Sequence, residues 1–183
     1  MRPHGEDDII GVLTHEHREI QTMFDDLQLA LGAEEKRRMA GEVTVELVRH
    51  AVAEERYLYP AARRIVPDGD AVADREIEDH AEVEKLLRRL AETDVGDPAF
   101  DRMVTSLVSD VMAHVQDEEA TLFPRLARHA DAAELAELGR RVRAARAAAP
   151  SRARPAGGPP LSRLLAPGGG LVDRVRDHLA GRI

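Results

Sequence analysis

Two short stretches of the chain each place a histidine four residues before a glutamate. The first, HAVAEERYLYP, contains His50 and Glu54, and the second, HVQDEEATLFP, contains His114 and Glu118. Residues four apart lie one turn apart on the same face of a helix, so each pair would present an imidazole and a carboxylate together. Both groups bind transition metals. The repeated spacing therefore indicates a metal site.

Two further histidines stand upstream of these pairs at nearly equal distances. His17 begins HREIQTMFDDL, 33 residues before His50, and His80 begins HAEVEKLLRRL, 34 residues before His114. The two stretches share the histidine, a glutamate two residues later and several apolar positions. We interpret the chain as two helical hairpins of one design.

Apolar residues recur at steps of three and four along four segments, which predicts four helices that each bury one stripe. The segments cover residues 7 to 31, 35 to 65, 72 to 93 and 98 to 129. Short connections make neighbouring helices antiparallel, so the predicted fold is all-α, an up-down-up-down four-helix bundle. Pro60 and Pro124 fall inside the second and fourth segments, where each is expected to kink or end its helix.

A bundle would bring the histidines and glutamates of all four stripes to one interior place. Six ligands are too many for one tetrahedral zinc ion and suit two first-row ions with bridging carboxylates. Two buried carboxylates also need compensating cations. The predicted ligands are His17, His50, Glu54, His80, His114 and Glu118. One histidine on an apolar face is more often an ordinary core residue, and the competing interpretation is a structural bundle without metal; the duplication favours the metal.

The H…HxxxE…H…HxxxE pattern strongly resembles the hemerythrin-like (HHE cation-binding) family over roughly residues 7 to 130. The resemblance implies a bundle around two non-heme iron ions, joined by an oxo or hydroxo bridge and by the two carboxylates. Oxygen-carrying hemerythrins have a further histidine one turn after the third-helix histidine, a position that here holds Glu84. That coordination position is open, or is filled by Glu84 or by Tyr57, which lies on the stripe of His50 and Glu54. Glu55 and Glu119 either support the ligand histidines or are solvated.

The resemblance implies chemistry with small ligands such as O₂, hydrogen peroxide or nitric oxide. Because the carrier's ligand set is incomplete, we expect a protective activity that consumes peroxide or nitric oxide rather than oxygen carriage. A tyrosine beside the irons, with Tyr57 as the candidate, would serve as an electron donor. The alternative is a sensor of iron, oxygen or redox state, or a metal-binding module, that signals to a protein partner through its C-terminal tail.

Composition sets the remaining expectations. The 183 residues include no cysteine, which excludes disulfides, iron–sulfur clusters and thiolate zinc sites. The expected divisions are the bundle at 1 to 130, an additional helix at 131 to 149, a flexible linker rich in proline, glycine and arginine at 150 to 170, and a short amphipathic helix at 171 to 183. Net charge is −8, yet residues 140 to 163 hold seven arginines and no acidic residue. We expect no specific nucleic-acid binding, no membrane insertion and a cytoplasmic protein.

Overall fold

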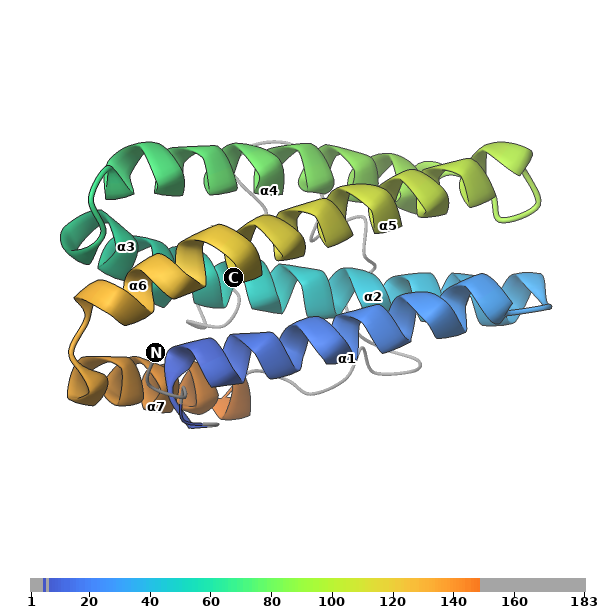
Figure 1. Ribbon diagram of the computed structural model, residues 1–183. Helices are drawn as coiled ribbons and strands as arrows, with labels where there is room; N and C mark the ends of the chain where they lie inside the picture. The colour runs from blue at the N-terminus through green and yellow to red at the C-terminus, as the bar shows by residue number, and fades with distance from the viewer. Residues whose placement is uncertain (1–4, 6, 149–183) are drawn as a thin grey trace.

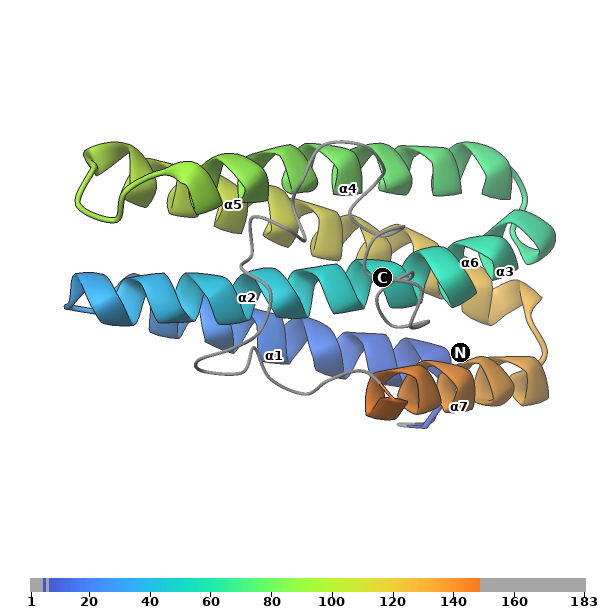
Figure 2. The same cartoon turned by 180° about the vertical axis from the view of Figure 1, so that it is seen from behind.

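Four helical rods lie side by side, and a shorter fifth helix packs alongside one of them near one end of the bundle (Figures 1 and 2). The computed structural model describes residues 5 and 7–148 of the chain. The elements are α1 (Ile9–Leu29), α2 (Ala33–Ala53), η1 (Glu54–Leu58), α3 (Tyr59–Ile65), α4 (Gly69–Glu92), α5 (Pro98–Asp117), η2 (Glu118–Leu122), α6 (Phe123–His129) and α7 (Ala132–Ala148). The predicted all-α, up-down-up-down bundle with a short extra helix is confirmed.

Local chemistry fixes where the rods begin and turn. The Asp8 side chain accepts a hydrogen bond from the amide of Gly11 at the start of α1, and Asp97 accepts one from Ala99 at the start of α5. Asp68 adopts the left-handed conformation, with φ of 56°, immediately before α4. Within the described ranges, no helix is both long enough and apolar enough to cross a membrane. The predicted linker at 150 to 170 and helix at 171 to 183 lie outside these residues.

Both interior prolines follow a π-helical turn, and neither ends its rod. The amide of Tyr59 donates to the carbonyl of Glu54, and the amide of Phe123 donates to that of Glu118, each five residues back. A proline has no amide hydrogen, and its ring clashes with a carbonyl four residues earlier in an α-helix. The wider π turn accommodates the proline by inserting one residue, and turns of this kind are frequent at functional sites. The rods α2–η1–α3 and α5–η2–α6 are therefore continuous.

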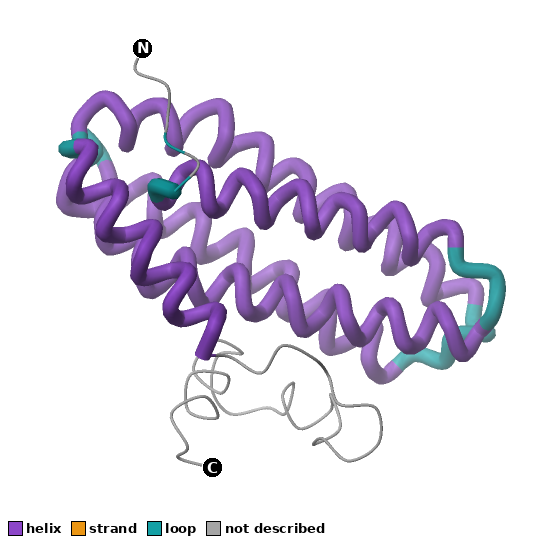
Figure 3. The backbone as a smooth tube through the Cα atoms, turned by 90° about the horizontal axis from the view of Figure 1, so that it is seen from below, coloured by secondary structure: helices purple, strands orange, loops and turns teal. Residues whose placement is uncertain are grey.

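The apolar core consists of two clusters, one at each end of the bundle. One cluster joins the first turns of α1 to α3, α6, the start of α4 and α7, which contributes Leu135, Leu138 and Val142. The other joins the rest of α1 to α2, the end of α4 and α5, with Phe24 and Phe100 among its largest members. Figure 3 shows the rods along their length, with the loops at the two ends. A layer of buried polar side chains lies between the clusters.

Gly69→Ala is expected to destabilise the fold by about 1–3 kcal/mol, the usual cost of inserting a methylene into a packed contact. A Cβ at Gly69 would lie 2.1 Å from the carbonyl oxygen of Ala62 and 2.9 Å from the Cα of Arg63, so backbone must move. The control is Gly32→Ser, where the added Cβ meets no atom within 4 Å and serine is a favoured helix cap. Urea denaturation measures both, and equal midpoints would contradict the prediction.

Candidate metal centre

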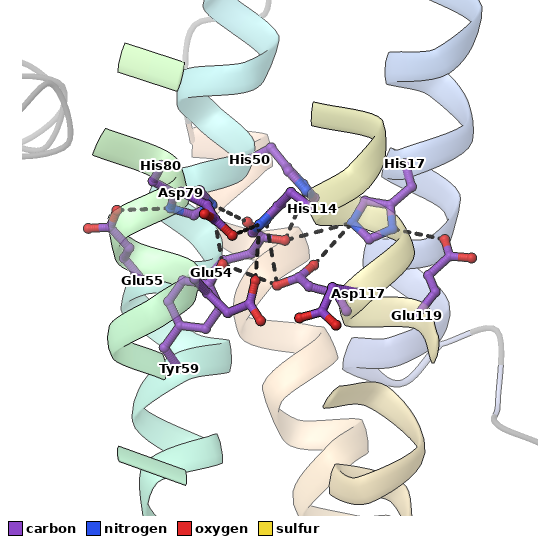
Figure 4. A network of polar contacts seen from close by, with 12 residues as sticks. His17, His50, Glu54, Glu55, Tyr59, Asp79, His80, His114, Asp117 and Glu119 are labelled. Carbon is purple, nitrogen blue, oxygen red and sulfur yellow. Dashed lines mark hydrogen bonds and ion pairs between the residues drawn. The ribbon is translucent and has the colours of Figure 1, made fainter. Parts of the chain in front are cut away.

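All six residues predicted as ligands lie together in the polar layer. Figure 4 labels five of them: His17, His50, Glu54, His80 and His114. The histidines come one from each rod, on α1, α2, α4 and α5, and the two glutamates open the π turns η1 and η2. Glu54 and Glu118 are completely buried, and the side chain of His80, the most exposed of the six, is 11% exposed. Within each pair, the four-residue spacing places the histidine and the glutamate one helical turn apart on the same face. The antiparallel packing of the rods then brings the four histidines to a similar height along the bundle.

Glu54 lies between imidazoles from three rods. Its Oε1 is 2.9 Å from Nε2 of His50 and 3.7 Å from Nε2 of His17, and its Oε2 is 3.2 Å from Nε2 of His80. Glu118 lies between imidazoles from two rods: its Oε2 is 3.4 Å from Nε2 of His17, and its Oε1 is 3.9 Å from Nε2 of His114. One nitrogen of every histidine therefore faces these two carboxylates.

Two main groups of donor atoms share Glu54, and a third group joins Glu76 to His114 and Glu118. His17, His50, Glu54 and Glu118 offer ligand atoms within 4.8 Å of one another, and Glu54, His80 and His114 do the same. Several of these atoms lack a hydrogen-bond partner among the described residues although they are fully buried: Nε2 of His17, His50 and His114, both oxygens of Glu54, and Oε2 of Glu118. Unpaired buried polar atoms are costly. Cations between the two groups would satisfy them, so the donor set fits a metal.

Each histidine is held from outside by a further glutamate on another segment. The Nδ1 atom lies 2.9 Å from Glu119 in His17, 2.9 Å from Glu16 in His50, 3.1 Å from Glu55 in His80 and 3.0 Å from Glu76 in His114. In His17, His50 and His80 the carboxylate accepts the hydrogen on Nδ1, which leaves Nε2 as the nitrogen that faces the interior. The contact between His114 and Glu76 is an ion pair only, since neither of its two atoms makes a hydrogen bond among the described residues. In Figure 4, Glu55 and Glu119 flank the layer on opposite sides.

Two of these supporting glutamates were not predicted from the sequence. Glu55 directly follows Glu54, and Glu119 directly follows Glu118. The sequence left open whether these two residues support the histidines or are solvated, and in the structure both contact histidines. Glu16 and Glu76 were missed, although a signal exists for each: Glu16 directly precedes His17, and Glu76 lies one turn before His80 on the same face. They are 2% and 0% exposed, which is rare for a glutamate without a partner.

The tyrosine that reaches the polar layer is Tyr59, and Tyr57 does not share in these contacts. The Tyr59 hydroxyl donates to Oε1 of Glu118 at 3.1 Å and lies 3.2 Å from Nε2 of His80. Tyr57 packs, partly buried, on the apolar cluster around α3, with the Arg56 guanidinium 5.4 Å from its ring centre. The expectation for Tyr57 assumed α-helical spacing, whereas the π turn adds a residue and rotates position 59 inward.

Glu84 also lies apart from the two donor groups. Its carboxylate pairs with Arg88, one turn further along α4. The equivalent of Tyr59 in the second repeat is Phe123, whose ring stacks on His17 with 5.7 Å between centroids and an interplanar angle of 6°. The two halves of the layer therefore differ: the half near His80 has a phenol, and the half near His17 has a phenyl ring.

Charge is tightly coupled among these side chains. Burial disfavours the charged imidazoles, but the carboxylates outweigh it and raise the pKa of His17 to about 9 and of His50 and His80 to about 10. Burial would raise the pKa of Glu54 too, yet the charge of His50 and the nearness of the imidazoles of His17 and His80 hold it well below its usual value. Burial, and then the charge of Glu54, raise the pKa of Glu118. Metal binding at these histidines would have to displace protons.

Tyr59 keeps its proton in this setting. Burial raises the pKa of its phenol well above the ordinary value of 10, and the negative charges of Glu118, Glu54 and Glu76 raise it further. The hydroxyl is therefore a hydrogen-bond donor that points at the carboxylate of Glu118.

The sequence matches one family model and two curated relatives. The sequence profile of the hemerythrin HHE cation binding domain matches residues 8–126. A DNA nickase from Nostoc sp. is 32% identical over 116 residues, which are 63% of this chain and 32% of the nickase, so the match spans about a third of that protein. An uncharacterized hemerythrin-like protein from Schizosaccharomyces pombe is 21% identical over 174 residues, 93% of this chain and 86% of the relative.

One solved structure supports the fold. The crystal structure of a hemerythrin HHE cation binding domain-containing protein from Mycobacterium kansasii superposes with a TM-score of 0.69 at 23% sequence identity. The superposition covers 92% of this chain and 98% of that chain. At this level of identity, the likeness concerns the arrangement of the helices.

Proposed function

Because the chain belongs to the hemerythrin HHE cation-binding family, we propose that its polar layer holds two iron ions and that the protein consumes small oxidants, hydrogen peroxide first among them. His17 and His50 would hold one ion, His80 and His114 the other, and the carboxylates Glu54 and Glu118 would lie between them. The observation that carries this proposal is the set of buried, inward-facing nitrogen and oxygen atoms without hydrogen-bond partners among the described residues.

Iron would supply electron transfer and Lewis acidity, and the protein supplies a buried, enclosed site. The ligand side chains are between 0% and 11% exposed, and apolar clusters close the layer on both sides, so the site suits a reactant of a few atoms. Disproportionation, 2 H₂O₂ → O₂ + 2 H₂O, balances without a further reactant because one peroxide is oxidised while the other is reduced. Consumption of nitric oxide fits the same enclosure but needs an external electron donor or acceptor.

Tyr59 supports turnover rather than carriage. Its hydroxyl lies beside both Glu118 and His80, where it can deliver a proton to the peroxide that is reduced and recover one from the peroxide that is oxidised. The position occupied by histidine in oxygen carriers holds Glu84, which pairs with Arg88. The nicking activity in the name of the Nostoc protein is no part of this proposal, since the match covers 32% of that protein.

Tyr59→Phe is expected to lower peroxide turnover about 100-fold, the lower end of what a positioned acid or base contributes. Its iron content should stay at the wild-type value, because the six proposed ligands are intact. The assay is oxygen release from peroxide by the iron-reconstituted protein, followed with an oxygen electrode. Tyr57→Phe, which removes a hydroxyl two residues away, is the matched control and should keep full activity.

Two results would count against these claims separately. An iron-loaded wild-type protein that releases no oxygen from peroxide would refute the peroxide activity and leave nitric oxide consumption or sensing as the function. Full activity in Tyr59→Phe would refute the role of the tyrosine alone. The sensing alternative is favoured by one specific observation: Arg146 on α7 contacts Glu16, which in turn contacts His50.

A further inference from the structure

The helix α7 lies outside the four rods, yet it is closely fitted to them. It runs beside the N-terminal half of α1, as Figures 1 and 2 show. Leu135, Leu138 and Val142 are buried in the apolar cluster at that end. Gly139 allows backbone contact: a Cβ there would lie 2.4 Å from the carbonyl oxygen of Asp7.

The last turns of α7 bring Arg146 onto three carboxylates of the bundle. Its Nη1 lies 3.0 Å from Oε2 of Glu16, and its Nη2 lies 2.6 Å from Oε1 of Glu46 and 3.7 Å from Oε2 of Glu19. The carbonyl of Arg146 accepts a hydrogen bond from Arg49 on α2 at 3.1 Å. The side chain of Arg146 is 22% exposed, so these contacts are partly shielded from solvent.

The oxygen of Glu16 that faces Arg146 is the one that holds His50. Oε2 of Glu16 lies 2.9 Å from Nδ1 of His50, and Nε2 of His50 lies 2.9 Å from Oε1 of Glu54. Arg146, Glu16, His50 and Glu54 therefore form one continuous chain of contacts from α7 to the centre of the polar layer. The Glu16 side chain is 3% exposed, and a buried carboxylate without a cationic partner is destabilising.

Among the described residues, the contacts that support His114 include none from α7. The carboxylate that supports His114 is Glu76, and its second oxygen is 3.4 Å from the guanidinium of Arg75 on the same helix, α4. The arginine that contacts the glutamate supporting His114 lies on the same helix as that glutamate. The arginine that contacts the glutamate supporting His50 lies on α7. His50 and His114 therefore hold corresponding positions in the two repeats, but the arginines behind their supporting glutamates come from different helices.

We propose that Arg146 is a positioning residue of the metal centre: it holds Glu16 and, through it, the orientation of His50, so that docking of α7 and occupancy of the metal position at His50 are coupled. The inference rests on the proposed metal site. Because coupling between two binding equilibria is reciprocal, metal at His50 strengthens the docking of α7 by the same factor. The state of the centre is thereby transmitted to the helix that leads into the C-terminal tail.

The test is titration of the full-length, metal-free protein with cobalt(II), followed by calorimetry and visible absorption. In the wild-type protein we expect two binding events. Arg146→Met should weaken one of them about tenfold, the low end of losses caused by disturbing the support of a metal-bound histidine, and leave the other within about twofold. The weakened event should be the one that His50→Gln abolishes. Arg141→Met, an exposed arginine on α7 paired with Glu137, is the matched control.

A second variant separates the position of α7 from the chemistry of Arg146. Gly139→Val keeps every charged group but forces α7 away from the start of α1, and it should weaken the same event. Hydrogen exchange supplies the reciprocal readout: cobalt should slow exchange at residues 132 to 148 in the wild-type protein and not in Arg146→Met.

The possible failures differ from one another. If Arg146→Met binds both ions like the wild-type protein, or weakens both equally, the positioning role is overturned while the metal site stands. If Gly139→Val leaves both affinities unchanged, the coupling to docking is overturned. If the wild-type protein binds no cobalt, the proposed function fails, and this inference fails with it. Melting curves by circular dichroism establish that each variant is folded at the temperature of the titration.

Discussion

Glu54→Gln is expected to leave the protein with almost no bound iron, a fall from two ions per chain to near zero. Glu54 belongs to both main donor groups, and each of its oxygens faces a different histidine, so its loss affects both positions at once. An amide keeps the volume but removes the negative charge and one of the two acceptor oxygens. The measurement is metal analysis after anaerobic reconstitution with iron(II) and removal of excess metal.

Glu84→Gln provides the comparison for this result. Glu84 is also a partly shielded glutamate, but it pairs with Arg88 and belongs to neither main donor group. Its substitution should leave the iron content unchanged. If Glu84→Gln lost an ion while Glu54→Gln kept both, the proposed ligand set would be wrong, and the open position inferred from the sequence would belong to Glu84 after all.

Removing the metal is expected to lower the melting temperature by about 10 °C or more. A ligand that binds only the folded state at about a thousand times its dissociation constant stabilises it by about 4 kcal/mol per site. One kcal/mol corresponds to about 2–4 °C in a domain of 150–250 residues. Scanning calorimetry of the iron-loaded and chelator-treated protein measures the difference. Glu54→Gln should melt at the same temperature with and without iron, and a metal response in that variant would contradict the explanation.

The sequence predicted the bundle and placed six side chains together because both depend on one regular period. Each histidine lies on an apolar stripe, and each paired glutamate follows its histidine by one α-helical turn, before the backbone departs from that geometry. The α-helical period ends at the π turns. Beyond Glu54 every position is displaced by one residue relative to an α-helix, so the spacing that selected Tyr57 no longer applied and Tyr59 took the inward place.

The supporting residues were harder to predict because their partners are distant in the chain. Glu16 faces His50 from another rod, and Arg146 faces Glu16 from a helix outside the repeat, and no local pattern links these three. Glu76 was obscured differently: on an amphipathic helix a charged residue is assumed to face solvent unless its partner is known. Pairing across helices requires the packing angles, which periodicity does not contain.

The two apolar clusters, separated by a charged layer, bear on the cooperativity of unfolding. A continuous core makes a small domain unfold in one step, since losing any part exposes the remainder. Here each end of the bundle has its own set of contacts, with α7 attached to one of them. Bound ions would cross-link all four rods between the clusters and join two partly independent units into one. In this protein the cofactor would then determine whether the chain opens as a whole or one end at a time.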